Sequence, residues 1–326
     1  MGKLKKAVAL ALSAVMCLSL AACGEKEEDV TMNIAGLKGP TTMGMVKLID
    51  DAQNGNTEND YNFTMAGTAD EITTKLIQGE LDIAAVPCNL ASVLYNKTEG
   101  GVQILAVNTL GVLYLVEKGD SVNSIEDLRG KTIYMTGKGA VPEYTVRYIL
   151  EQNGLTVDSD VNIEWKNEVN EIVALMQSTD EDIVAVLPQP FATVAQTQVE
   201  GLHTVMDLNE AWNALDNGSQ IVTGVIVART EFVEKYPKHV EAFLKEYSES
   251  IDYVVNNPAD AATLIENVGI VKAAVAEKAL PYCNITYLDG DEMKNAVNGY
   301  LTVLYEQNPK AVGGELPGDN FYYTGK

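Results

Sequence analysis

The sequence predicts an α/β protein of two similar lobes, each a mostly parallel sheet flanked by helices. Short apolar runs alternate with helical patterns along most of the chain. The order of these segments repeats at an offset of one hundred residues. The length of 326 residues suits about two domains, and a hydrophobic fraction of 46% suits a folded core.

The repeat determines the order of the elements. Residues 32–35 form a strand-like run that is followed by a glycine-containing loop and a helical pattern, and residues 132–135 open the same series again. Residues 82–87 and 182–188 are apolar runs bounded by Asp and Pro, which suits strands buried on both faces. Each copy therefore predicts the order strand, loop, helix, strand, helix, strand, helix, which favours a parallel sheet with crossover helices.

The segments outside the repeat complete the prediction. Residues 219–228 form one more strand-like run, and four helical patterns follow at residues 237–257, 258–267, 271–280 and 290–307. Because helices need a sheet to cover, we expect the chain to enter lobe 2 near residues 117–122 and to return near residues 216–222, and these two crossings predict a hinge. We expect lobe 1 to comprise residues 31–117 and 222–326, and lobe 2 residues 118–221.

The first residues have the features of an export signal. Lysines are followed by an apolar stretch that is too short for a comfortable membrane span, and small residues precede Cys23. The small residues and the cysteine resemble a bacterial lipobox; a plain signal peptide with a chance cysteine is the alternative. The resemblance implies removal of residues 1–22, a lipid on Cys23 and an acidic tether over residues 23–30, which places the protein outside the cytoplasm on a membrane face.

Charge and composition exclude several functions. The chain carries −23, and removal of residues 1–22, which contain three lysines and no acid, leaves −26. This acidity argues against nucleic acid and against direct docking on anionic lipid. With two His we expect no metal site and no cofactor. Cys88 and Cys283 remain in the mature chain, where two buried free thiols are favoured over a disulfide.

Ligands of open α/β sheets bind beyond the carboxyl ends of the strands. Six loops occupy such positions, and they line one cleft if the lobes face each other: residues 36–42, 67–70, 87–89, 136–144, 167–170 and 188–191. Donor side chains in these loops are Thr41, Thr42, Thr68, Asn89 and Thr136, and candidate apolar walls are Tyr144, Phe191 and Trp212. Glu143 and Glu168 are candidates for a ligand amine.

Each candidate also has a purely structural interpretation. Thr41, Thr42 and Thr68 are suitable helix N-caps, Trp212 suits core packing, and first-turn acids such as Glu143 complement a helix dipole. The loop around Gly137 lacks the spacing of a phosphate-binding loop. The sequence shows no nucleophile–base arrangement, so we expect no enzymatic activity.

Three stretches, residues 78–87, 130–133 and 187–193, resemble the SsuA/THI5-like branch of ABC-transporter substrate-binding lipoproteins. The tail, with residues 308–314 and 321–323, is similar to an uncharacterised clostridial and Thermotoga-type subgroup. This resemblance implies a type II periplasmic-binding-protein-like fold. It also implies ligand contacts at Pro40, Thr41, Thr42, Asn89, Thr136, Gly137, Glu143 and Gln189.

The resemblance implies a monomeric solute-binding lipoprotein that captures a small molecule between two lobes and delivers it to an ABC permease. Ligands of the branch include sulfonates and pyrimidine-like compounds, and the two glutamates make a zwitterionic or heteroaromatic ligand an alternative to a bare sulfonate. A secreted enzyme on the same scaffold and a sensory or adhesive binding module are the alternative functions.

Overall fold

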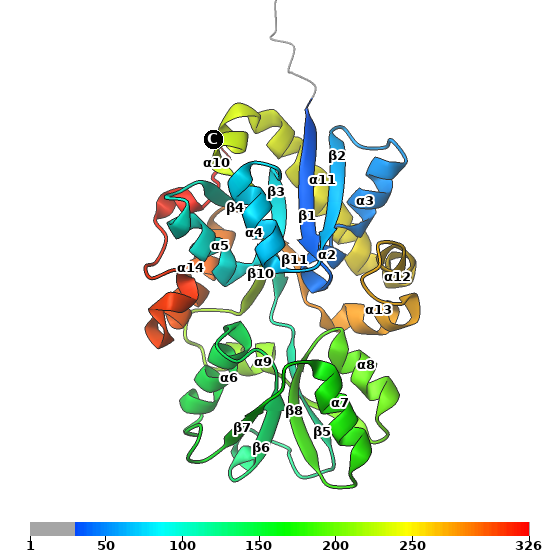
Figure 1. The fold of residues 1–326 in the computed structure, drawn as a ribbon, viewed down its shortest axis with the longest axis vertical. Coiled ribbons are helices and arrows are strands. Elements are labelled where there is room, and N and C mark those ends of the chain that lie inside the picture. The colour runs from blue at the N-terminus through cyan, green and yellow to red at the C-terminus, as the bar shows by residue number, and fades with distance from the viewer. Residues whose placement is uncertain (1–29, 326) are drawn as a thin grey trace, which may run out of the picture. The chain divides into compact units, whose positions relative to one another are not determined.

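The computed structural model describes residues 30–325, and the compact unit that carries the fold is Met32–Lys326. The signal segment, Cys23 and the acidic tether expected from the sequence lie outside the described residues. Two mixed sheets with helices on their faces make up this unit (Figure 1). No described helix is long and apolar enough to cross a membrane.

The first half of the chain alternates strands and helices as the repeat predicts. The elements that precede the second sheet are β1 (Thr31–Leu37), α2 (Pro40–Met43), α3 (Val46–Gln53), β2 (Asp60–Ala66), α4 (Ala69–Gln78), β3 (Ile83–Pro87), α5 (Cys88–Lys97) and β4 (Val102–Leu110). The elements of the second sheet and its helices are β5 (Leu113–Lys118), β6 (Thr132–Met135), α6 (Val141–Gln152), β7 (Asn162–Trp165), α7 (Val169–Ser178), β8 (Ile183–Pro188), α8 (Phe191–Gln198), β9 (Leu202–Asp207) and α9 (Leu208–Asn213).

The chain then returns to the first sheet. The elements after this return are β10 (Val222–Arg229), α10 (Thr230–Lys235), α11 (Pro237–Asn256), α12 (Pro258–Asn267), α13 (Ala273–Ala279), β11 (Ile285–Leu288) and α14 (Gly290–Gln307). Four of these helices match the four helical patterns expected from the sequence, whereas the short strand β11 was not expected. The strand order is β11-β4-β10-β3-β1-β2 in the first sheet and β7-β6-β8-β5-β9 in the second.

The internal repeat is confirmed in three dimensions. Helices α4 and α7 begin and end one hundred residues apart. Strands β2, β1 and β3 follow one another across the first sheet, as β7, β6 and β8 do across the second, and β1 pairs with β3 in parallel as β6 does with β8. Lobe 1 is therefore the first sheet with its helices, and lobe 2 is the second sheet with its helices.

Two details differ from the expectation. Both sheets are mixed, because β10 runs antiparallel to β3 and β4, and β5 runs antiparallel to β8 and β9. A strand that arrives from the other lobe starts at the carboxyl edge and must run back through the sheet. Strand β5 also belongs to the second sheet, so the first crossing falls on residues 111–112 instead of 117–122. The chain crosses back between α9 and β10.

The core follows from the apolar strands. All four residues from Ile83 to Val86 in β3 are fully buried, as expected for a strand covered on both faces. The sheet lies between helices on both faces, so neither face of this strand meets water. Cys88 and Cys283 are buried and unbonded. Burial raises the pKa of both thiols, that of Cys283 to about 12.

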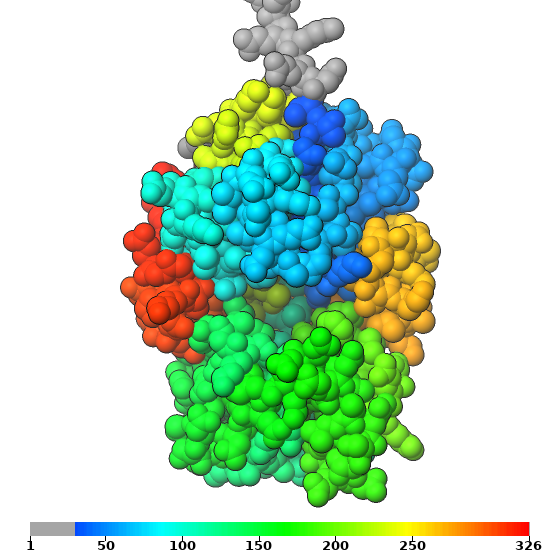
Figure 2. Space-filling model, viewed as in Figure 1, coloured from blue at the N-terminus to red at the C-terminus, as the bar shows by residue number. Residues whose placement is uncertain are grey.

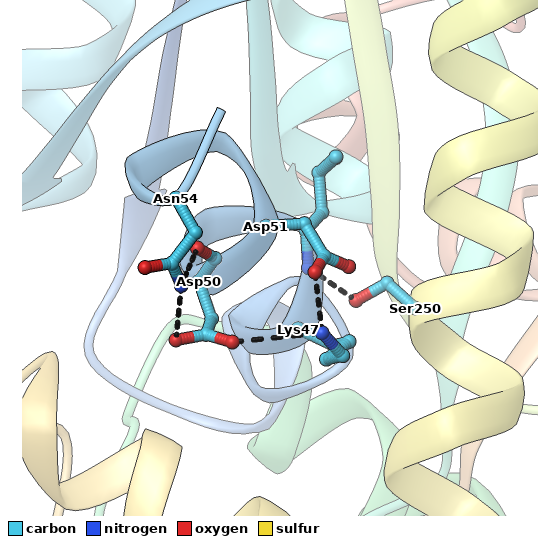
Figure 3. A network of polar contacts seen from close by, with 6 residues as sticks. Lys47, Asp50, Asp51, Asn54 and Ser250 are labelled. Carbon is cyan, nitrogen blue, oxygen red and sulfur yellow. Dashed lines mark hydrogen bonds and ion pairs between the residues drawn. The ribbon is translucent and has the colours of Figure 1, made fainter. Parts of the chain in front are cut away.

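A buried serine fixes the segment after β1 (Figure 3). Ser250 of α11 accepts a hydrogen bond from the Leu48 N–H at 3.0 Å and donates one to the Gly44 carbonyl at 2.7 Å. Helix α3 has no side-chain cap of its own, so Ser250 serves one of the free N–H groups of its first turn. Lys47 on the same helix pairs with Asp51. The two hydrogen bonds of Ser250 fix the end of α2 and the first turn of α3 against α11.

The C-terminal segment is bound along lobe 1. Asn89 and Asn96 of α5 donate to the carbonyls of Ala311 and Val312, each at 3.1 Å. The Tyr323 N–H donates to the Ile104 carbonyl at 2.9 Å beside β4. The last residues of the chain therefore help to cover the first sheet.

Candidate functional site

The topology brings the carboxyl edges of the two sheets together. Pro87, at the end of β3, pairs with Gly224 near the start of β10, and Pro188, at the end of β8, pairs with Leu113 at the start of β5. Both crossings therefore connect the edges at which β1, β3, β6 and β8 end. The link between Leu110 and Leu113 spans at most about 11 Å. Figure 2 shows a hollow between the blue-to-cyan segments of lobe 1 and the green segments of lobe 2.

The first crossing is held by side-chain amides from both lobes. The Gly111 N–H donates to Asn209 at 3.3 Å, and the Gly111 carbonyl accepts from Asn284 at 2.5 Å. A Cβ on residue 111 would lie 2.7 Å from Asn209 atoms, so glycine is needed for this close approach. The Val112 carbonyl accepts from the Gln189 N–H at 2.9 Å. Residues 111–112 thus form a short link with a defined conformation between the two sheets.

Further contacts between the lobes include bonds made by Thr145 and by Tyr114. Thr145 of α6 and Tyr300 of α14, both fully buried, share a hydrogen bond of 3.1 Å. The Tyr114 hydroxyl of lobe 2 donates to the Tyr282 carbonyl of lobe 1 at 2.8 Å, and the two rings meet edge to face. These contacts couple the lobes beside the crossings.

Residues 40–42 form a tight turn at the carboxyl end of β1. The Thr42 hydroxyl donates to the Leu37 carbonyl at 2.6 Å, which closes the turn. The Thr41 carbonyl accepts from Asn108 of β4 at 2.9 Å, and the Thr41 side chain is 8% exposed. A Cβ on Gly224 would lie 2.5 Å from the Thr41 methyl group, so this glycine lets the turn approach β10. Pro40 begins α2.

The corresponding loop of lobe 2 joins β6 to α6 through Thr136 and Gly137. The Glu143 carboxylate accepts from the Gly139 N–H at 2.6 Å and pairs with Arg147 at 2.7 Å. Tyr144 donates to the Gly139 carbonyl at 3.3 Å. Burial acts to raise the pKa of Glu143, but the Gly139 N–H and Arg147 outweigh burial and hold that pKa below its usual value. Glu143 is therefore bonded within its own loop in this conformation.

Tyr144 and Gln189 have further partners. Asn308, which follows α14 in lobe 1, donates to the Tyr144 hydroxyl at 2.7 Å, so Tyr144 connects the lobes. Gln189 precedes a cis proline and is 4% exposed. Its side-chain oxygen accepts from the Thr193 hydroxyl at 2.9 Å. Gln189 therefore lies at the carboxyl end of β8 with its side-chain carbonyl already bonded.

Three predicted ligand contacts have structural partners in this conformation. Thr68 caps α4 by accepting from the Glu71 N–H at 3.3 Å. Asn89 of α5 binds the Ala311 carbonyl in the C-terminal segment. Trp212 is fully buried, donates to the Ser219 hydroxyl at 3.0 Å and packs against aromatic rings of both lobes. These arrangements match the capping and core-packing interpretations of Thr68 and Trp212.

Two further predicted residues are exposed. Phe191, the first residue of α8, is 45% exposed at the carboxyl end of β8. Glu168 caps α7 in a reciprocal pair with Glu171, so its carboxylate also serves the helix.

Sequence reasoning missed the asparagines that organise the carboxyl edges. Asn108 is 1% exposed and binds the turn that contains Thr41. Asn209 and Asn284 hold Gly111 from opposite lobes. The only local signal for Asn108 is a polar residue at the end of an apolar run. Asn209 and Asn284 both bond Gly111, which is distant from them in sequence, so no local pattern indicates that they hold the first crossing.

Comparisons with known proteins agree on the fold. Residues 100–261 match the family described as NMT1/THI5 like. No curated protein matches the sequence. The chain is similar to the crystal structure of an ABC transporter from Parabacteroides distasonis, with 27% identity and a TM-score of 0.74 over 90% of this chain and 99% of that chain.

More distant structures show the same fold. The periplasmic aliphatic sulphonate binding protein SsuA from Escherichia coli is 16% identical, with a TM-score of 0.68 over 88% of this chain and 92% of that chain. The CA3427 gene product of Candida albicans, described as having the generic periplasmic binding protein structural fold, is 11% identical with a TM-score of 0.54 over 89% of this chain and 99% of that chain. The chain has the periplasmic-binding-protein fold, and its residues 100–261 match the NMT1/THI5-like family.

Proposed function

We propose that this chain is the extracytoplasmic solute-binding lipoprotein of an ABC importer, which captures a small organic molecule between its lobes and delivers it to a membrane permease. The observation that carries the proposal is the joining of two carboxyl edges at one hollow by short crossings. Ligands bind at such edges in open α/β sheets. The solved structures similar to this chain include binding proteins of ABC transporters, which supports a binding role.

The mechanism needs movement and no covalent chemistry. A ligand that contacts both lobes stabilises the closed arrangement in proportion to its extra contacts there. Residues 111–112 are short enough to localise the rotation, while the return segment between α9 and β10 follows. The permease then recognises the closed, loaded form.

The proposed contacts come from the turns at the carboxyl edges. In lobe 1 they are Pro40, Thr41, Thr42 and Asn89, and in lobe 2 they are Thr136, Gly137, Glu143, Tyr144 and Gln189. Thr41 gives the sharpest test among them. It lies beside β10, and its hydroxyl makes no hydrogen bond to any of the described residues. Export and anchoring follow from residues 1–22 and from a lipid on Cys23.

The proposal is tested by native mass spectrometry of the freshly purified protein. A co-purified small molecule that is chemically unchanged after release supports a carrier, whereas a transformed molecule supports an enzyme. Thermal-shift screening then measures stabilisation by that compound. A protein that carries no compound and is stabilised by none would refute the proposed function.

A matched pair of variants locates the site. Thr41→Val keeps the side-chain volume and removes the hydroxyl, so we expect a weaker thermal shift with the co-purified compound. Thr73→Val is the control, because the Thr73 hydroxyl bonds only the Ala69 carbonyl within α4. Equal thermal shifts for the two variants would place the ligand elsewhere.

A further inference from the structure

Most positive charges of the described residues are already engaged. Among residues 30–325, only five lysines lack an ion pair or hydrogen bond through the ammonium group, and they are Lys38, Lys97, Lys138, Lys278 and Lys310. Lys97, Lys278 and Lys310 lie in the last turns of helices. A cation there complements the negative end of the helix dipole, which gives these three an ordinary explanation.

Lys38 and Lys138 have no such explanation. Both are exposed, and both lie in loops that precede helices, where the helix dipole disfavours a cation. Each is next to a glycine at which an added Cβ would meet no atom within 4 Å, namely Gly39 and Gly139. The two lysines are therefore exposed side chains on corresponding loops of the two lobes.

The polar groups around these lysines are used internally. The Thr42 hydroxyl bonds the Leu37 carbonyl, and the Glu143 carboxylate bonds the Gly139 N–H and Arg147. Lys138 also lies near enough to Glu143 to lower its pKa, but that carboxylate is already paired with Arg147. Neither ammonium group has an ion pair or a hydrogen bond among the described residues.

Both loops lie at the edges that border the hollow. The loop with Lys38 follows β1, the loop with Lys138 follows β6, and the two crossings join the edges where these strands end. On the proposed closure the two loops, each with one lysine, approach each other in a protein of strongly negative net charge. An anion between them removes the repulsion between the two lysines and gains two charge-assisted contacts.

We infer that Lys38 and Lys138 are specificity-determining residues that select a small organic dianion, one acidic group for each lobe. This inference rests on the proposed function and names its ligand class. The dianion is required for full closure, because Lys38 has no ion pair among the described residues and Glu143, a carboxylate near Lys138, is already paired with Arg147. A neutral or monoanionic compound leaves at least one lysine unpaired.

The test is isothermal titration of the purified full-length protein with malonate, succinate and glutarate. The matched uncharged probe is succinamide, and the matched monoanion is butyrate. We expect at least one dicarboxylate to bind about tenfold or more tightly than both matched probes, which is the size of one charge-assisted contact. The preference for the dianion is expected to fall as the salt concentration rises.

Variants distinguish a specific role of Lys38 and Lys138 from an effect of the protein's net charge. Lys38→Gln and Lys138→Gln are each expected to weaken dicarboxylate binding about tenfold, and the double variant to abolish the preference over succinamide. The control is the double variant of Lys97→Gln and Lys310→Gln, which removes the same charge from helix ends and should change affinity less than about twofold. All four sites are on the surface, and circular dichroism checks that the fold is intact.

The outcomes are distinct. Full dicarboxylate affinity in the double variant of Lys38 and Lys138 overturns the inference, as does equal affinity for succinamide or a lack of binding by all three dicarboxylates. If a neutral or monoanionic compound binds instead, the charge selection fails while the proposed function stands. If no compound of any class binds or co-purifies, the proposed function itself fails.

Discussion

Replacing Ser250 with alanine removes one oxygen atom that makes two buried hydrogen bonds. The residue is 2% exposed, so water does not readily replace the lost partner for the Leu48 N–H and the Gly44 carbonyl. Each net hydrogen bond contributes about 1 kcal/mol, and a buried group left without a partner costs about 1–3 kcal/mol. We expect Ser250→Ala to lower the free energy of unfolding by about 2–3 kcal/mol.

Urea unfolding followed by circular dichroism measures this loss as a lower midpoint with an unchanged slope. Ser248→Ala is the matched control, because Ser248 lies on the same helix, is only half-buried and makes no hydrogen bond through its hydroxyl to a described residue. The reasoning is refuted if Ser250→Ala and Ser248→Ala differ by less than about 0.5 kcal/mol. That result would mean that water or a shift of α3 satisfies both groups.

Two further changes test the electrostatics of the fold. Arg229→Met removes the guanidinium that donates to Asp82 at 2.8 Å, and it should lower the free energy of unfolding, measured with urea, by about 2 kcal/mol. Glu231→Gln removes only the exposed 3.4 Å contact with Arg229 and should leave the free energy of unfolding unchanged. Similar losses of stability in the two variants would contradict a buried ion pair between Arg229 and Asp82. Glu143→Gln should lower stability at neutral pH, because the pKa of Glu143 is held below its usual value by its hydrogen bonds. A carboxyl group whose pKa is lower in the folded protein stabilises the fold above its unfolded-state pKa, and this stabilisation is lost as the pH falls. The urea midpoints of Glu143→Gln and the unmodified protein should therefore converge below about pH 4. A constant difference between the midpoints down to about pH 3 would refute a lowered pKa of Glu143.

The internal repeat made most of the fold predictable. Helices α4 and α7 and the buried strands β3 and β8 lie where the matched segments place them. The sheet to which β5 belongs was not predictable, because residues 113–116 are apolar and buried and suit either sheet equally. A local pattern specifies a strand, while its partner is chosen by packing against distant segments.

The position of the candidate loops was predictable, whereas the hydrogen-bond partners of individual side chains were not. The carboxyl-edge position of residues 40–42, 136–144 and 188–191 follows from strand order. The bond from Asn89 to Ala311 does not, because the two residues are 222 positions apart in sequence. Side-chain amides find their acceptors only after the chain has folded, so sequence patterns do not assign them to a ligand or to a carbonyl.

The central place of β10 in the first sheet has a consequence for the order in which the protein matures. Strands β3 and β4 do not pair with each other, since β10 lies between them. A nascent chain that ends before residue 222 therefore holds every strand of the second sheet, whereas the first sheet still lacks its middle. The contiguous part is able to assemble before the rest of the chain has emerged, and the discontinuous part must wait for its late strand β10 and then for Tyr322 and Tyr323.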